Sequence, residues 1–269
     1  MRALVLSGGG MFGAYQAGAW SALEDVFRPD LVVGCSVGAL NGWLIASGCP
    51  AAEMEKQWLS MPAMARHRWR VPPGPLDGFI DPTPFEQQVR TLHHTWRPKM
   101  PVAVVATELA RLRPRIFRET EIGWEHLAAS CAVFGALPQY RIDGRRYSDG
   151  GLLGALPLWA ALELGATSIV AVQVMPRMPW PLRAGLRMLR AWSGLRTTAA
   201  ADVPVFTIAP RVPLGSLREA AFWDRGRAER WLAQGRHDAE EVASNISRMV
   251  CFGSPVPTHG HVSHLPVEG

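Results

Sequence analysis

The chain has 269 residues and a mass of 29.5 kDa, enough for one large α/β domain or two small ones with a substantial buried core. Hydrophobic residues make up 48% of the chain, which excludes global disorder, and no apolar run approaches the roughly 20 residues of a transmembrane helix. The net charge of +5 comes almost wholly from arginines spread over several segments, so we expect no nucleic-acid partner. Eleven tryptophans and ten methionines fit an anionic lipid interface better.

The apolar segment over residues 3–7 is too short for a secretory signal and runs straight into a glycine turn. We therefore interpret it as a first strand. The cysteines show neither paired nor metal-type spacing, which favours reduced thiols in a cytoplasmic protein. They are Cys35, Cys49, Cys131 and Cys251.

Apolar runs typical of buried strands alternate with runs of helical periodicity, which predicts a parallel sheet covered by helices. The predicted strands span residues 3–7, 31–33, 102–107, 115–118, 168–174 and 203–208. The predicted helices span residues 12–26, 37–46, 124–133, 157–164, 181–192 and 224–249. Asp143-Gly144 predicts the turn of a hairpin over residues 139–148.

Two segments depart from this pattern. Residues 61–100 are rich in Pro, Arg, His and Trp, which predicts a surface insertion or a lid. Residues 253–269 are rich in Pro, Gly and His, which predicts a flexible tail. We expect residues 1–252 to form one domain.

The first glycine turn contains Gly8, Gly9, Gly10 and Gly13 between a predicted strand and helix, and its spacing satisfies the dinucleotide-binding fingerprint. That fold needs an acidic residue at the end of the second strand, whereas the nearest acid, Asp30, precedes the strand. The same geometry can instead form an anion hole, because consecutive glycines let backbone N–H groups converge at a helix N-terminus. We favour the anion hole.

The second turn, residues 34–38, has the G-x-S-x-G form of a nucleophile elbow centred on Ser36. In such a turn the serine hydroxyl projects from the top of the sheet. Gly34 and Gly38 flank it because larger side chains would collide in so tight a bend.

Ser36 needs a base. In a classical triad a histidine would follow in the order Ser, Asp, His, but none of the eight histidines lies at the end of a predicted strand. A carboxylate can replace histidine, and Asp149 follows the predicted hairpin strand directly. Gly150 and Gly151 after it permit a sharp turn and a close backbone approach.

These three motifs, in this order, resemble those of patatin-like phospholipases: G-G-G-x-[RK]-G, G-x-S-x-G and D-G-[GA]. The segment 81–85, Ala129-Ser130 ahead of Pro138, and Pro157 match further landmarks, so that the resemblance covers residues 1 to about 174. It implies a three-layer α/β/α fold with a mainly parallel central sheet.

The resemblance also implies that a Ser36–Asp149 dyad hydrolyses acyl esters of lipids through an acyl-enzyme, with neither metal nor cofactor. The tetrahedral oxygen would be held by backbone N–H groups. These are the amides of Gly8, Gly9, Gly10 and Val37.

One position departs from the family pattern: Phe12 stands where the family has Arg or Lys. The missing charge favours the description "lipid acyl ester hydrolase" over "phospholipase A2". Phe12 either influences the substrate class or packs in the core. An acyltransferase or thioesterase on the same site, and a non-catalytic lipid-binding module, stay open as alternatives.

The predicted helix over residues 181–192 carries leucines along one stripe and arginines along another, with tryptophans at its ends. Such a helix suits peripheral association with an anionic membrane. The alternative is a core-packed surface helix with solvated arginines. The stripes consist of Leu182, Leu186 and Leu189, and of Arg183, Arg187 and Arg190.

Overall fold

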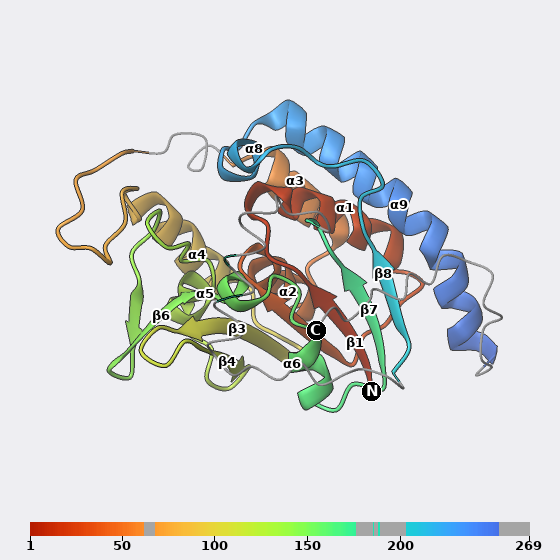
Figure 1. Ribbon diagram of the computed structural model, residues 1–269. Coiled ribbons are helices and arrows are strands. Elements are labelled where there is room, and N and C mark those ends of the chain that lie inside the picture. Colours follow the sequence, from red (N-terminus) through yellow and green to blue (C-terminus); the bar gives the residue numbers. More distant parts are fainter. Residues whose placement is uncertain (62–67, 176–184, 186–187, 189–202, 253–269) are drawn as a thin grey trace.

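The computed structural model describes residues 1–61, 68–175, 185, 188 and 203–252. In this part of the chain a sheet of eight strands runs through the molecule, with helices on both of its faces (Figure 1). The strands are β1 (Arg2–Leu6), β2 (Leu31–Cys35), β3 (Val102–Glu108), β4 (Arg113–Arg118), β5 (Tyr140–Ile142), β6 (Arg145–Asp149), β7 (Ser168–Val172) and β8 (Val205–Ile208).

The sheet has the order β5-β6-β3-β2-β1-β7-β8, and β4 also pairs with β3. The neighbouring strands β3, β2, β1, β7 and β8 are all parallel. In contrast, β4 and β6 pair antiparallel with β3, and β5 pairs antiparallel with β6. The expectation of a mainly parallel central sheet is therefore confirmed.

Side chains of each central strand alternate between two cores, as expected for strands buried on both faces. On β1, Leu4 and Leu6 belong to the larger core with α1, α2 and α9, while Ala3 and Val5 belong to the smaller core with α6. This arrangement confirms the three-layer fold. The helices are η1 (Gly10–Phe12), α1 (Gly13–Leu23), α2 (Val37–Ala46), α3 (Ala51–Leu59), α4 (Thr83–Thr95), α5 (Trp124–Ser130), η2 (Gly150–Leu153), α6 (Leu158–Glu163), α8 (Leu217–Ala221) and α9 (Arg225–Phe252).

Most predicted elements are present with small changes at their ends. The helix behind the elbow has the predicted bounds, and the helix expected from residue 12 begins as the 3-10 turn η1. The helices α3, α4 and α8 were not predicted. Of the helix expected over 181–192 the structure describes only Gly185 and Met188, and the tail 253–269 lies outside the described residues.

The segment predicted as an insertion or lid contains α4. Pro84 lies in the first turn of this helix, where its missing N–H does no harm. The apolar positions Phe85 and Val89 are buried one turn apart, and His93 continues the same face against the ring of Trp43. The helix is thus part of the packed domain.

The long helix α9 packs along α1 (Figure 1). A buried hydrogen bond of 2.9 Å joins the two helices, from the Tyr15 hydroxyl to Oδ2 of Asp238. None of the described helices combines the length and apolar character that crossing a bilayer requires.

Candidate active site

The sheet register brings Ser36 and Asp149 to the same level. Cys35, the residue before Ser36, pairs with Val105 of β3, and Asp149 pairs with the next residue of the same strand, Ala106. Because β4 pairs with β3 along residues 103–108, β2 and β6 lie end to end along the other edge of β3. The ends of the two strands adjoin there: a Cβ on Gly150, the residue after Asp149, would lie 2.8 Å from the Cβ of Cys35.

Ser36 occupies a strained position between β2 and α2, with φ 54° and ψ −132°. A Cβ on Gly34 would lie 2.2 Å from the carbonyl oxygen of Gly38, and one on Gly38 would lie 2.4 Å from that of Leu6. Both glycines are therefore needed for the bend. The Ser36 N–H donates to Oγ of Ser130 at 2.8 Å, and this hydroxyl donates to the Val105 carbonyl at 2.7 Å.

Asp149 reaches the site because the chain crosses closely over β3 after it. A Cβ on Gly150 would lie 2.2 Å from the carbonyl oxygen of Val105, so only glycine permits this crossing. The Asp149 N–H donates to the Ala132 carbonyl, and its own carbonyl accepts a bond of 3.0 Å from the Thr107 hydroxyl. Its backbone is thereby held on two sides.

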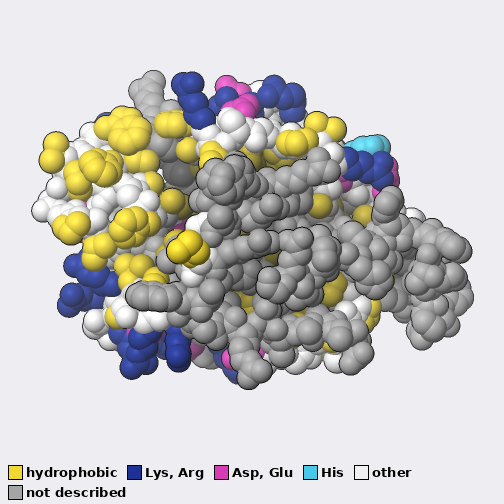
Figure 2. All heavy atoms as spheres, in the orientation of Figure 1, with side chains coloured by type: hydrophobic (Ala, Val, Ile, Leu, Met, Phe, Trp, Pro, Cys, Tyr) yellow, Lys and Arg dark blue, Asp and Glu magenta, His cyan; other side chains and the backbone are white. Residues whose placement is uncertain are grey.

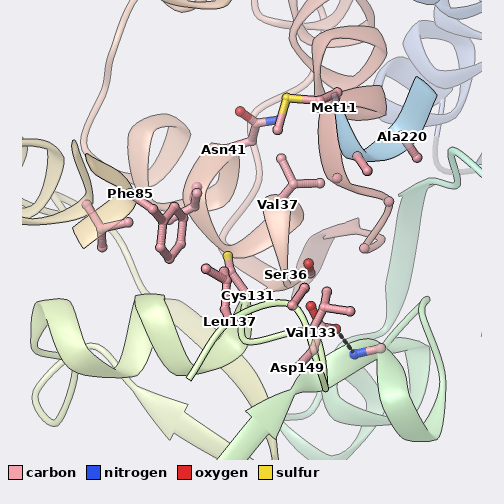
Figure 3. Close-up of a pocket in the computed structure, with 18 of the residues that line it drawn as sticks. Met11, Ser36, Val37, Asn41, Phe85, Cys131, Val133, Leu137, Asp149 and Ala220 are labelled. Atoms are coloured by element: carbon pink, nitrogen blue, oxygen red, sulfur yellow. Dashed lines mark hydrogen bonds between the residues drawn. The ribbon is translucent and has the colours of Figure 1, made fainter. Parts of the chain in front are cut away.

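The Asp149 carboxyl group is buried beside Ser36. Its Oδ1 accepts a bond from the Gly151 N–H at 2.6 Å. Its Oδ2 is buried without a hydrogen-bond partner of good geometry among the described residues, and Figure 3 shows the side chain beside that of Ser36. Burial raises the pKa of this carboxyl to about 6, although the Ser36 hydroxyl and the Gly151 N–H act to lower it.

The glycine loop lies on the side of Ser36 away from Asp149. The expectation for its first residue, Gly8, is wrong. The Gly8 N–H donates to the Ala155 carbonyl at 2.8 Å, so this amide is not free to bind an oxyanion. The amides of Gly9, Gly10 and Val37 have no hydrogen-bond acceptor among the described residues, and all three residues line the cavity described below. Gly13 does not line the cavity and instead opens α1 against Val37.

Hydrogen bonds of buried polar side chains hold the glycine loop in place. Gln16 donates to the Ser7 carbonyl at 2.6 Å, and Asn41 donates to both the Gly13 carbonyl and Oε1 of Gln16, each at 2.9 Å. The Trp58 indole completes this network by donating to Oδ1 of Asn41 at 3.1 Å. The loop is thereby fixed to α1, α2 and α3.

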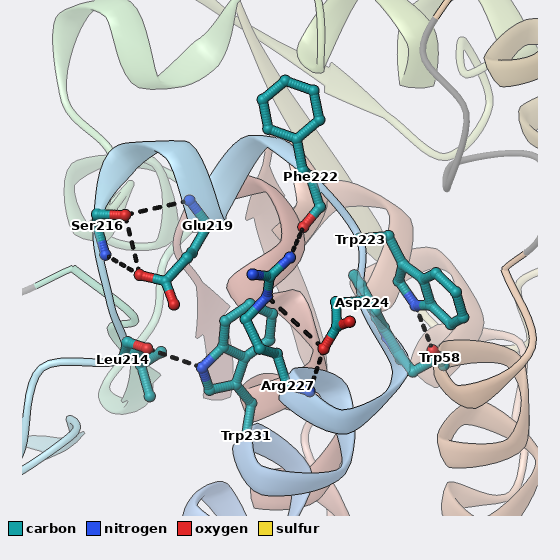
Figure 4. A network of polar contacts seen from close by, with 9 residues as sticks. All are labelled: Trp58, Leu214, Ser216, Glu219, Phe222, Trp223, Asp224, Arg227 and Trp231. Carbon is teal, nitrogen blue, oxygen red and sulfur yellow. Dashed lines mark hydrogen bonds and ion pairs between the residues drawn. The ribbon is translucent and has the colours of Figure 1, made fainter.

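The helix α8 packs against the same loop. A Cβ on Gly10 would lie 2.2 Å from the Ala220 carbonyl oxygen, which shows how closely α8 approaches. Figure 4 shows the contacts that hold α8 and the start of α9: Ser216 and Glu219 cap α8 reciprocally, and the Trp223 indole donates to the Trp58 carbonyl at 2.8 Å.

A cavity of about 620 Å³ opens at Ser36 and Asp149. Its wall is mainly apolar and is built by α2, α3, α4, α8 and the turn that follows α5 (Figure 3). This size and lining suit a hydrophobic chain that presents one polar reacting group. Leu40, Leu44, Met61, Phe85, Val89, Leu92, Leu137 and Met175 are among the apolar residues of the wall.

Phe12 and the histidines take no part in this wall. Phe12 is buried, and its ring packs edge-on against Trp231 of α9 with centroids 5.0 Å apart, so the core-packing interpretation applies. None of the histidines within the described residues lines the cavity. The cysteines whose side chains are described, Cys35, Cys49 and Cys131, are free and buried.

Sequence reasoning did not find the residues that support the site. The segment Ala129-Ser130 was noted only as a landmark, yet Ser130 is the hydrogen-bond acceptor for the nucleophile elbow. The pair Gln16 and Asn41 gave no signal, because single polar residues in apolar helices become informative only when their partners are known.

Comparison with known proteins finds a matching family and several relatives. A family model described as patatin-like phospholipase matches residues 4–162. The human patatin-like phospholipase domain-containing protein 6 is 28% identical over 184 residues, which are 64% of this chain and 13% of that protein. Lysophospholipase NTE1 of Cryptococcus neoformans is 26% identical over 178 residues, 64% of this chain and 11% of that protein. The chain thus spans a small part of these relatives.

Among solved structures, VipD from Legionella pneumophila has the same fold with a TM-score of 0.50 at 12% sequence identity. The match covers 91% of this chain and 67% of that one.

Proposed function

The chain belongs to the patatin-like phospholipase family, and from this we propose that it hydrolyses acyl esters of lipids through a Ser36–Asp149 dyad. One observation carries the proposal: a buried carboxylate with an unpartnered oxygen lies beside a serine in a strained elbow, at an apolar cavity. The names of two relatives, a phospholipase domain protein and a lysophospholipase, support the same reaction class.

In the proposed mechanism, Oγ of Ser36 attacks the ester carbonyl while Oδ2 of Asp149 accepts its proton. The alcohol then leaves with that proton, and an acyl-enzyme remains. Asp149 next takes a proton from water, whose oxygen attacks the acyl carbon, and the fatty acid leaves as the proton returns to Ser36.

The negative oxygen of each tetrahedral intermediate would be bound by the free amides of Gly9, Gly10 and Val37. Each such donor typically contributes on the order of 10²–10³ in rate. The macrodipole of α2, a helix of ten residues that begins at Val37, favours negative charge at the same place.

Product analysis tests this function. The protein is incubated with a lysophospholipid, a monoacylglycerol and a long-chain acyl thioester, each with and without glycerol as an acceptor alcohol. We expect free fatty acid from the oxygen esters whether or not glycerol is present. A new glycerol ester as the main product would indicate an acyltransferase, and preferential cleavage of the thioester would indicate a thioesterase.

Absence of any product would leave the alternative of a lipid-binding module. Peripheral association with an anionic membrane, and a cytoplasmic location, belong to the proposal as well. The sequence support for that association is the basic amphipathic pattern over residues 181–192.

A further inference from the structure

Large apolar side chains gather on one exposed surface, which we call the apolar rim. Their exposed fractions lie between 52% for Val133 and 92% for Val71. Isolated exposed hydrophobic residues are ordinary, whereas a contiguous group of them indicates an interaction surface. The apolar rim consists of Trp69, Val71, Phe79, Val133 and Phe134.

Main-chain hydrogen bonds hold the two segments of the apolar rim together. Arg70 donates to the Phe79 carbonyl at 2.8 Å, Phe79 donates to the Gly135 carbonyl at 2.9 Å, and Trp69 forms a β-bridge with Ile80. The loop before α4 is thereby joined to the turn after α5. Figure 2 shows hydrophobic side chains gathered at the end of the molecule where Figure 1 places this loop.

The apolar rim continues into the cavity. Val133 and Phe134 are both exposed and part of the cavity wall, and Ile80, which bridges to Trp69, also lines the cavity. An apolar chain can therefore pass from the outer surface toward Ser36 along a continuous apolar path.

We propose that the apolar rim is the surface through which this protein sits on a lipid layer. Trp69, Val71 and Phe79 insert among the headgroups, and Val133 and Phe134 guide an acyl chain into the cavity. This inference rests on the proposed function, because a lipid hydrolase must draw its substrate out of an aggregate. It assigns the contact to residues other than those of the helix predicted from the sequence over residues 181–192.

A lipid layer fits this surface better than a protein partner. A protein seated on the apolar rim would cover Val133 and Phe134, where the cavity reaches the surface. A lipid layer supplies the chain that enters there. Lys and Arg side chains border the hydrophobic side chains on one side in Figure 2, which suits anionic headgroups.

The test replaces the three residues of the apolar rim that do not line the cavity, as Trp69→Ser/Val71→Ser/Phe79→Ser. The matched control, Val26→Ser/Val212→Ser, removes exposed apolar side chains elsewhere. Both are placed on a Ser36→Ala background and sedimented with vesicles of phosphatidylcholine, with and without phosphatidylserine. We expect at least about tenfold weaker vesicle binding for the triple variant and unchanged binding for the control.

Catalysis is measured separately with Ser36 restored. Turnover of a dispersed short-chain ester should be equal in the triple variant and the wild type, while turnover of vesicle lipid should fall about tenfold. Thermal unfolding checks that the triple variant is folded. If it is not, Val71→Asp provides the test, because a charge at this exposed position opposes insertion without disturbing the core.

Equal vesicle binding by the triple variant and the wild type would overturn the proposal, as would a wild type that binds neither vesicle. Conversion of a dimer to a monomer by the triple mutation, without loss of vesicle binding, would assign the surface to a second copy of the chain. Weaker vesicle binding by the triple variant, together with no hydrolysis by any form, would uphold the lipid surface and refute the proposed function.

Discussion

Protonation of the Asp149 carboxyl links activity to folding stability. Its pKa is raised by burial from 3.8 to about 6, so the ionised form that the proposed mechanism needs is the form that the fold disfavours. Stability associated with the neutral form is fully present below the unfolded pKa and is lost as the pH rises through about 6. The difference of about two pKa units corresponds to roughly 3 kcal/mol at neutral pH.

Asp149→Asn should separate the effect of this carboxyl on activity from its effect on folding stability. The amide keeps the shape but accepts no proton, so kcat should fall on the order of 10²–10⁴-fold. The free energy of unfolding should rise by up to about 3 kcal/mol at neutral pH, and this gain should vanish below about pH 4. Urea titrations at several pH values measure it. In the wild type, kcat/KM for a dispersed ester should fall as the pH drops below about 6.

A kcat/KM that stays constant well below pH 6, or an Asn variant whose relative stability does not depend on pH, would contradict this role of Asp149. Activity that survives in Asp149→Asn and disappears when one histidine is replaced would favour the classical triad.

Phe12 provides a second test at the residue scale. Phe12→Arg would bury a guanidinium where the Phe12 ring now packs against Trp231, so the free energy of unfolding should fall by about 3 kcal/mol or more. Phe12→Leu keeps an apolar side chain and should lose less. Denaturant titration measures the stability of both variants. Hydrolysis assays measure their preference between anionic and neutral lipid esters. A stable Arg variant with altered preference would return Phe12 to the substrate site.

At the scale of elements, the elbow depends on how closely α2 approaches β1. Gly38→Ala would place a Cβ 2.4 Å from the Leu6 carbonyl oxygen, so α2 must shift and Ser36 must move with it. We expect a large loss of kcat and a lower melting temperature. Gly42→Ala, one turn later in α2, would place its Cβ 3.1 Å from Cγ1 of Val32, which can adjust. The Gly42→Ala control should keep a kcat and a melting temperature close to those of the wild type. Equal values for the two variants would refute the role given to Gly38.

Elements with a strong local signal were predicted well. The strand β2 and the helix α2 followed from an apolar run, two glycines and a second apolar run. The helix α4 was missed because prolines and histidines around it suggested a loop, although Phe85 and Val89 show its helical spacing. The five-residue α8 is held mainly by its capping box and by contacts with distant residues, which a local pattern does not reveal.

In the whole molecule, parallel pairing of β1 with β2 brings the glycine loop and Ser36 to one edge of the sheet, whereas Asp149 ends β6, which pairs antiparallel with β3. The meeting of Ser36 with Asp149 could be anticipated from the resemblance but not from strand pairing alone. The commitment of the Gly8 amide to Ala155 could not, because it depends on a contact across 147 positions. The cavity wall likewise combines helices from separate parts of the chain.

Covalent labelling tests whether Ser36 is the nucleophile. A fluorophosphonate probe is incubated with the wild type, Ser36→Ala and Asp149→Asn, and the adduct is located by peptide mass spectrometry. We predict one stoichiometric adduct on Ser36 in the wild type, none in a folded Ser36→Ala protein and strongly slowed labelling in Asp149→Asn. An adduct on another residue, or equal labelling of the Ser36→Ala protein, would contradict it.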